Sequence, residues 1–88
     1  MTPTLNHTIV WCRDNRASAG YLADTLGLPP PTKWGPFMEV VLSNGVTLAY
    51  HNYYDREGEI ASQHYAFLVT EEDFDAIFSR IRHNGQPY

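Results

Sequence analysis

The chain has 88 residues, a hydrophobic fraction of 43% and a formal net charge of −4, which fit one small folded domain rather than a disordered chain. Its six lysine and arginine residues are scattered, so neither nucleic acid nor an anionic membrane is expected as a partner. The sequence has no apolar run that could span a bilayer, no signal peptide and a single cysteine, and it therefore predicts a cytoplasmic protein without an internal disulfide.

The first part of the chain predicts a strand followed by a helix. Residues 5–12 are rich in β-branched and aromatic side chains, which favours a strand. Asp14 is a suitable N-cap for a helix over 15–26, and Gly27 is suited to end that helix in a left-handed conformation. These signals together predict a β–α unit with defined limits.

The middle of the chain predicts a β-hairpin. Three prolines at 29–31 force an extended connection, and residues 34–36 have the composition of a turn. An Asn-Gly dipeptide at 44–45 lies between two apolar runs, and such a dipeptide is a strong hairpin signal. We therefore expect strands over 37–42 and 46–53.

The last third of the chain predicts a polar loop over 54–63, a strand over 64–69 and a helix over 71–83. Thr70 and Asp73 have the spacing of a capping box at the start of that helix. The helix carries an apolar stripe at helical spacing, formed by Phe74, Ile77, Phe78 and Ile81. The resulting plan is α+β, with a largely antiparallel sheet and two helices.

One pattern occurs twice in the chain. A histidine opens an apolar run at His7 and again at His64, an acidic residue follows seven positions later, and each copy closes at a glycine, Gly27 or Gly85. Repetition at this spacing indicates two copies of one β–α unit. If the copies pair about a pseudo-twofold axis, the two histidines can point into one cavity, and imidazoles are common metal ligands.

Several stretches of the chain carry a family resemblance: Leu-Asn-His-Thr-Ile-Val at 5–10, Leu-Gly-Leu at 26–28, Asn-Gly-Val-Thr-Leu at 44–48, and His-Tyr-Ala-Phe at 64–67, leading into Asp-Phe at 73–74 and Arg-His-Asn-Gly at 82–85. Their order and spacing resemble the vicinal oxygen chelate superfamily. That superfamily contains glyoxalase I, extradiol dioxygenases, and the fosfomycin- and bleomycin-resistance proteins.

The resemblance implies a fold and a metal site. In such proteins two βαβββ modules, from one chain or two, form a curved sheet around a cleft that holds a divalent metal ion. It implies a single domain over 1–88, with a first βαβββ module over 1–60 and the β–α start of a second module over 61–88, on a mainly antiparallel curved sheet. It also implies His7 and His64 as ligands of zinc, manganese, iron or nickel.

The second module is incomplete in this sequence. The last strand of that module usually donates a glutamate to the metal, and here this strand has no counterpart. Either the sequence is a fragment of a longer chain, or oligomerisation covers what is missing. By the resemblance we expect a homodimer, with or without exchange of modules between the two copies.

Further residues are candidates for the cleft. His51 has the strand parity of a further metal ligand or a polar cleft residue. Ile9 stands where fosfomycin-resistance transferases usually have a threonine aligned with the substrate. The candidate substrate pocket comprises Ile9, Trp34, Phe37, Ala49 and Tyr50. Aromatic residues of this kind also serve a core or a dimer interface, so both interpretations stay open.

Two classes of function follow, and each involves a small-molecule ligand. In the first, the protein is a metal-dependent lyase, dioxygenase or transferase, and the metal acts as a Lewis acid on two neighbouring substrate oxygens. In the second, it is a metal-free dimer that sequesters an antibiotic or another small molecule by aromatic stacking. A half-fold whose only property is dimerisation is a third interpretation.

Overall fold

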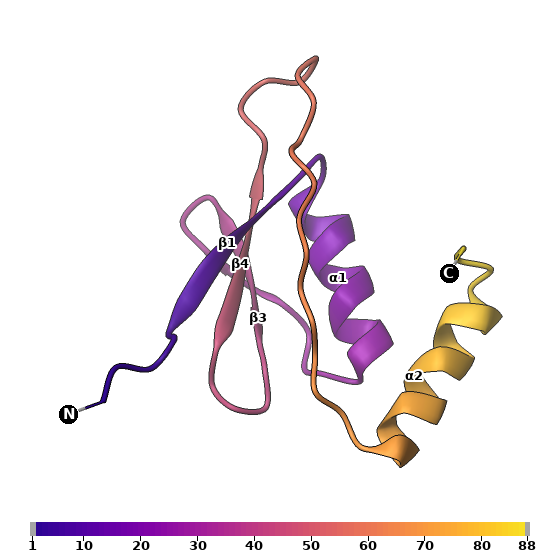
Figure 1. The fold of residues 1–88 in the computed structure, drawn as a ribbon. Helices are drawn as coiled ribbons and strands as arrows, with labels where there is room; N and C mark the ends of the chain where they lie inside the picture. The colour runs from indigo at the N-terminus through magenta and orange to yellow at the C-terminus, as the bar shows by residue number, and fades with distance from the viewer. Residues whose placement is uncertain (1, 88) are drawn as a thin grey trace.

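The computed structural model describes residues 2–87, and Figure 1 shows their arrangement. The elements follow in the order β1 (His7–Cys12), α1 (Asn15–Leu26), β2 (Thr32–Trp34), β3 (Phe37–Val41), β4 (Thr47–Asn52) and α2 (Glu71–His83). Both helices have the predicted limits, and the β3–β4 hairpin lies where the Asn-Gly dipeptide predicted it. The chain is a βαβββ module followed by one helix, which confirms the α+β class.

The four strands form one mixed sheet in the order β1-β4-β3-β2. β1 and β4 are parallel, whereas β3 pairs antiparallel with β4 on one side and with β2 on the other. In the hairpin the Leu42 amide donates to the Val46 carbonyl at 2.8 Å, and Glu39 lies opposite Ala49. The turn thus sets which side chains share a row across the sheet.

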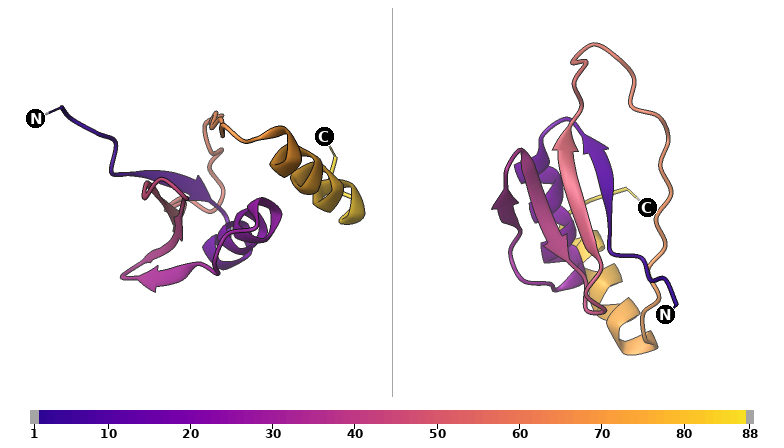
Figure 2. Two further views of the ribbon diagram at one scale, coloured as in Figure 1. Left: turned by 90° about the horizontal axis from the view of Figure 1, so that it is seen from below. Right: turned by 90° about the vertical axis from the view of Figure 1, so that its left-hand side faces the viewer.

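Helix α1 covers one face of the sheet and leaves the other face open, as the right panel of Figure 2 shows. Because side chains alternate along a strand, the even-numbered residues of β1, β3 and β4 point toward α1. The hydrophobic core lies between this face and the helix. It comprises Val10, Cys12, Ala19, Ala23, Val40, Leu48 and Tyr50.

The starts of both helices are held by the residues that the sequence indicated. The Asp14 carboxylate accepts hydrogen bonds from the amides of Arg16 at 3.1 Å and Ala17 at 3.3 Å. At α2 the Thr70 hydroxyl accepts a hydrogen bond from the Asp73 amide at 3.2 Å. Each cap satisfies amides that the first turn of a helix leaves unpaired, which is why these limits are readable in the sequence.

The prediction of a strand over 64–69 is wrong. The segment belongs to no sheet and runs beside β1 (Figure 1). The Gln63 side chain bonds both backbone groups of Trp11, at 3.1 and 3.0 Å, and the Tyr65 hydroxyl donates to the Ile9 carbonyl at 3.2 Å. These interposed side chains separate the two backbones, whereas a β-ladder needs backbones about 4.8 Å apart.

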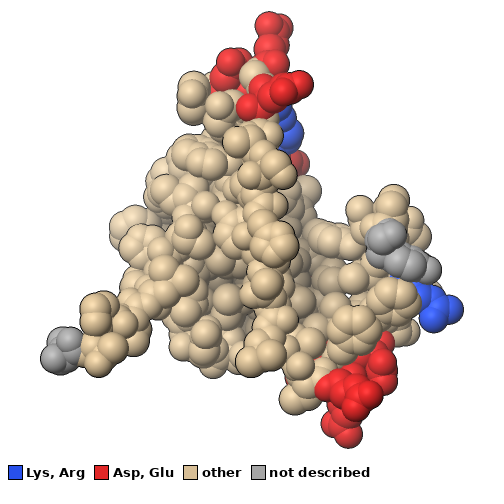
Figure 3. Space-filling model, in the orientation of Figure 1, with Lys and Arg blue, Asp and Glu red and all other residues tan. Residues whose placement is uncertain are grey.

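Helix α2 packs loosely against the rest of the chain. None of its residues is buried, and its acidic first turn, Glu71 to Asp73, is exposed at one end of the molecule in Figure 3. The Arg80 guanidinium links it to α1 by donating to the Thr25 carbonyl at 2.9 Å. Within residues 2–87 no helix is long and apolar enough to cross a membrane.

Candidate functional site

The face of the sheet opposite α1, called the open face below, carries side chains in three rows. The rows follow from the register of the four strands. The first row holds His7, Thr47 and Val41; the second holds Ile9, Ala49, Glu39 and Thr32; the third holds Trp11, His51, Phe37 and Trp34. The structure therefore brings five of the predicted cleft residues together in the second and third rows: Ile9, Ala49, His51, Phe37 and Trp34.

Three rings of the third row contact one another and form the aromatic row: Trp11, His51 and Phe37. The His51 ring lies between the other two, with centroid distances of 5.1 Å to Trp11 and 5.0 Å to Phe37 and interplanar angles of 64° and 72°. Such edge-to-face pairs each contribute about 0.5–1.5 kcal/mol beyond area burial. All three rings are partly exposed, so the row is held in place and remains accessible to a ligand.

One nitrogen of His51 is fixed by the backbone. Its Nδ1 lies 2.7 Å from the carbonyl oxygen of Asn52. A carbonyl oxygen can only accept a hydrogen bond, so Nδ1 carries the proton. In the neutral ring Nε2 is left with a lone pair, and it can accept a hydrogen bond or bind a metal ion.

Glu39 is a carboxylate on the open face that the sequence analysis did not identify. It is partly exposed and lies opposite Ala49 in the second row. Ala49 also has Ile9 as its neighbour on β1, and it is 3% exposed although it lies outside the core cluster. The hairpin contained the signal for Glu39, because a turn over 43–45 fixes the pairing of positions 39 and 49.

His7 has the features of a metal ligand. It is exposed at the start of β1, and its Nδ1 lies 2.7 Å from Oδ1 of Asn6. An amide oxygen also only accepts, so Nδ1 of His7 carries the proton and Nε2 is left as the atom that can bind a cation. Histidines that bind metals usually have such an outer hydrogen bond, which fixes the ring.

The structure does not bring His64 to His7. His64 is exposed and lies between Gln63 and Tyr65, whose side chains both reach β1. Alternation along an extended segment directs His64 away from that strand. Among residues 2–87 no group of three His, Cys, Asp or Glu side chains is placed to hold a metal ion. The residues that the structure describes thus offer His7 as a fitting ligand without a complete set around it.

Two other candidates lie apart from His7. His51 pairs with Trp11, four residues along β1 from His7 and thus about 13 Å away, which is too far to share one ion in this arrangement. The sequence predicts Tyr50 in the pocket, but the structure places it in the core on the covered face. Burial there raises the pKa of Tyr50 to about 12. Alternation explains the difference, because Ala49 and His51 occupy the open face.

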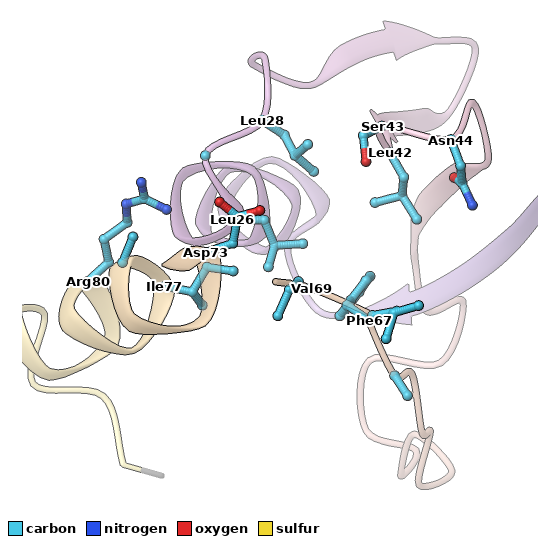
Figure 4. Close-up of a pocket in the computed structure, with 14 residues that line it drawn as sticks. Leu26, Leu28, Leu42, Ser43, Asn44, Phe67, Val69, Asp73, Ile77 and Arg80 are labelled. Carbon is cyan, nitrogen blue, oxygen red and sulfur yellow. The ribbon is translucent and has the colours of Figure 1, made fainter. Parts of the chain in front are cut away.

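A separate cavity of about 610 Å³ lies between α1, α2, the β3–β4 turn and the extended segment 66–69 (Figure 4). Its lining is mainly apolar and includes Leu26, Leu28, Leu42, Phe67, Val69 and Ile77. Arg80 also lines it, and its guanidinium bonds the Thr25 carbonyl. None of the predicted site residues lines this cavity. The cavity exists because α2, which has no buried residue, packs loosely on the first module.

Two solved oxidases are similar to this chain over nearly its whole length. Oxidase ChaP-H2 is 54% identical, with a TM-score of 0.88 over 97% of this chain, and oxidase ChaP-H1 is 49% identical, with a TM-score of 0.87 over 96%. The chain spans 65% of the length of each oxidase. A possible glyoxalase from Bacillus cereus shares the fold, at 21% identity and a TM-score of 0.70 over 96% of this chain and 76% of its own.

No curated protein matches the chain. A family model does match it over residues 4–87, and its description is Glyoxalase/Bleomycin resistance protein/Dioxygenase superfamily. The match includes all six helices and strands, and with them every row of the open face. The chain belongs to the glyoxalase/bleomycin resistance protein/dioxygenase superfamily.

Proposed function

We propose that this chain forms part of an oxidase-type active site, which acts on a small oxygen-bearing substrate with a divalent metal ion. The geometry of His7 carries the proposal, because its Nδ1 is fixed and its Nε2 is free at the exposed start of β1. The 54% identity to an oxidase over 97% of this chain supports the class of reaction.

The proposal gives separate roles to the residues of the open face. His7 and His64 hold the metal ion, and Asn6 keeps the His7 ring in orientation through its 2.7 Å hydrogen bond. When bound, the ion supplies Lewis-acid chemistry at a substrate oxygen. Ile9 and the aromatic row line the surface against which the rest of the substrate lies.

Pairing of two copies completes the site in this proposal. Within one described chain His64 is directed away from β1. The edge of β1 that does not pair with β4 is bonded by the side chains of Gln63 and Tyr65. A twofold-related copy, with or without exchange of the segments after β4, brings the partner's His64 to His7. The proposed functional unit is therefore a homodimer.

Elemental analysis of protein purified without chelator tests the two ligands. We expect the wild type to retain close to one divalent metal ion per site. His7→Ala and His64→Ala should each lower the metal content at least tenfold, because two imidazoles are the main donors. His83→Ala is the matched control, since His83 ends α2 and belongs to no row of the open face.

Two results would contradict this proposal. Metal retained in full by both His7→Ala and His64→Ala would remove the proposed ligands. A second contradicting result combines two measurements: light scattering shows the metal-bound wild type to be a monomer, and both variants lose the metal. This result would contradict the homodimer and place the two histidines together within one chain.

The aromatic row favours a second function, the binding of a flat ligand without a metal. Partly exposed rings held at 5.0–5.1 Å from one another offer a surface on which such a ligand can stack. A folded wild type that contains no metal under the conditions above and still binds an aromatic compound would support sequestration in place of oxidation.

A further inference from the structure

Two asparagines in the chain are followed directly by glycine: Asn44 in the β3–β4 turn and Asn84 at the end of α2. We infer that Asn84 is a site of spontaneous deamidation in the folded protein, that Asn44 is protected from it, and that the modification loosens the end of α2. This inference goes beyond the proposed function and involves none of the residues of the open face.

Deamidation at an Asn-Gly pair needs only water and a backbone that can change its conformation. The glycine nitrogen loses its proton to solvent and attacks Cγ of the asparagine, so a carbon–nitrogen bond forms and the side-chain nitrogen leaves as ammonia. Water then opens the resulting succinimide at either carbonyl and gives aspartate or isoaspartate. Asparagine and water thus become an acid and ammonia, without oxidation or reduction. Glycine favours the ring closure because it has no side chain to obstruct the approach.

The β3–β4 turn holds Asn44 away from this reaction. Oδ1 of Asn44 accepts a hydrogen bond from the Val46 amide at 3.2 Å. The Gly45 amide, which would supply the attacking nitrogen, donates to the Leu42 carbonyl at 2.9 Å. The two reacting groups are therefore both fixed, although Asn44 is exposed. Freeing them requires opening the turn between two strands that supply the core, and such opening is rare.

The end of α2 places a weaker restraint on Asn84. Its side chain is also exposed, and among residues 2–87 it has no hydrogen-bond partner. The Gly85 amide donates to the Arg82 carbonyl at 3.1 Å, but no residue of α2 is buried, and the helix stands apart from the sheet (Figure 1). Opening its last turn therefore breaks exposed backbone bonds without loss of the core, and the Gly85 nitrogen reaches Cγ of Asn84 more often.

A carboxylate at position 84 weakens the contact between the two helices. Asn84 is the C-cap of α2, so the new charge lies at the negative end of the helix dipole. Asp24 of α1 and Arg80 line the same small cavity as Asn84, of about 370 Å³. The new charge repels Asp24 and competes for the Arg80 guanidinium, which otherwise donates to the Thr25 carbonyl. Isoaspartate also lengthens the backbone and moves the Gly85 amide away from its acceptor.

Peptide mass spectrometry tests the site on the full chain. Wild-type protein is incubated at pH 8 and 37 °C, and the gain in mass from amide to acid is followed at each asparagine. While the chain is folded, Asn84 should deamidate at least tenfold faster than Asn44. In concentrated urea the two rates should come within about threefold of each other, because both pairs are then unrestrained.

Hydrogen exchange of two variants tests the effect on α2. Asn84→Asp carries the charge of one product, and it should speed exchange of the amides in the last two turns of α2 about threefold. Asn84→Gln keeps an uncharged amide and should exchange as the wild type does. It should also stay unmodified at position 84, because its longer side chain must close a larger ring. The amides of β1 and β4 should be unchanged in both variants, which shows that the fold is retained.

Three results would overturn the inference. Equal rates at the two asparagines of the folded chain, or faster reaction at Asn44, would remove Asn84 as the preferred site. A rate difference that persists in urea would show that neighbouring residues, and not the fold, set the preference. Wild-type exchange throughout α2 in Asn84→Asp would refute the loosening of that helix.

Discussion

The two histidine-led repeats share a sequence pattern but differ in structure. In the first, β1 joins the sheet, and α1 buries Ala19 and Ala23 against it. In the second, the segment 64–69 joins no sheet, and α2 has no buried residue. A capped, amphipathic sequence is therefore enough to specify a helix, whereas burial of its apolar stripe requires a sheet to pack against.

The hairpin that follows the first repeat accounts for the burial of α1. β4 is the direct neighbour of β1, and β3 and β4 supply Val40 and Leu48 to the core beneath α1. Within residues 2–87 no such hairpin follows α2. The stacked rings of Phe74 and Phe78, with centroids 6.0 Å apart, therefore contact each other in place of a sheet.

Truncating the core of the first repeat should cause a large loss of stability. Leu48→Ala removes a side chain that is 4% exposed, and it should lower the free energy of unfolding by about 3 kcal/mol. Phe74→Ala removes a side chain that is 55% exposed, and it should cost less than about 1 kcal/mol. Urea denaturation followed by circular dichroism measures both. Similar losses would show that α2 is packed as firmly as α1.

The core of the first repeat should also respond to alkaline pH through Tyr50. Burial raises the pKa of Tyr50 from 10.0 to about 12, so the folded state holds the phenolic proton more tightly than the unfolded state. The resulting stability is complete below about pH 10 and is lost as the pH rises through about 12. With solvent screening, this loss should be about 1–2 kcal/mol.

Urea denaturation at pH 9 and pH 11.5 measures this loss. Tyr50→Phe should remove most of the decline, because the substituted ring has no proton to release. Tyr21→Phe is the control, since Tyr21 is 39% exposed on α1, and that variant should keep the wild-type decline. An equal decline in Tyr50→Phe would show that another group is responsible.

Local signals explain the parts of the fold that the sequence predicted well. Asp14 and Thr70 cap helices whose limits agree with the structure, and the Asn-Gly dipeptide places the hairpin. Each of these features depends on neighbouring residues alone. The βαβββ resemblance implies the short strand β2, but local signals do not locate it, because it pairs with β3 across a turn in a stretch whose residues predict only a connection and a turn.

Features that depend on distant residues were predicted less well. The segment 64–69 has the composition of a strand, but it contacts β1 through the Tyr65 side chain and joins no sheet. Placing Glu39 on the open face and Tyr50 in the core requires the hairpin register together with the alternation of β4. Metal binding by His7 and His64 stays a prediction, because it depends on groups brought together from separate parts of the fold or from two copies.

The two glycines that close the repeats offer a smaller and closely matched comparison. Both have a φ of +70°, where a side chain is strained. A Cβ at Gly27 would lie 3.2 Å from Nη1 of Arg80, whereas one at Gly85 would meet nothing within 4 Å. Gly27→Ala should lower the free energy of unfolding by about 1 kcal/mol.

Gly85→Ala should lower the free energy of unfolding by less than half as much as Gly27→Ala, because the end of an unburied helix can unfold locally without loss of the core. Urea denaturation measures both losses. Asn84→Ala serves as a control for changes at the end of α2 that leave both glycines in place. A larger loss for Gly85→Ala than for Gly27→Ala would show that the end of the second repeat is the more firmly held of the two.

The smallest expected effect concerns the contact between the two repeats. The Trp11 amide donates to Oε1 of Gln63 at 3.1 Å, and Nε2 of Gln63 donates back to the Trp11 carbonyl at 3.0 Å. Gln63→Ala should therefore speed hydrogen exchange at the Trp11 amide about fivefold, since one exposed hydrogen bond contributes about 1 kcal/mol. The Thr47 amide, which donates to the Asn6 carbonyl at 3.0 Å on the other edge of β1, should exchange as in the wild type. Unchanged exchange at Trp11 would mean that backbone pairing, rather than this side chain, protects the edge, and the second repeat would then resemble the first more closely than the structure shows.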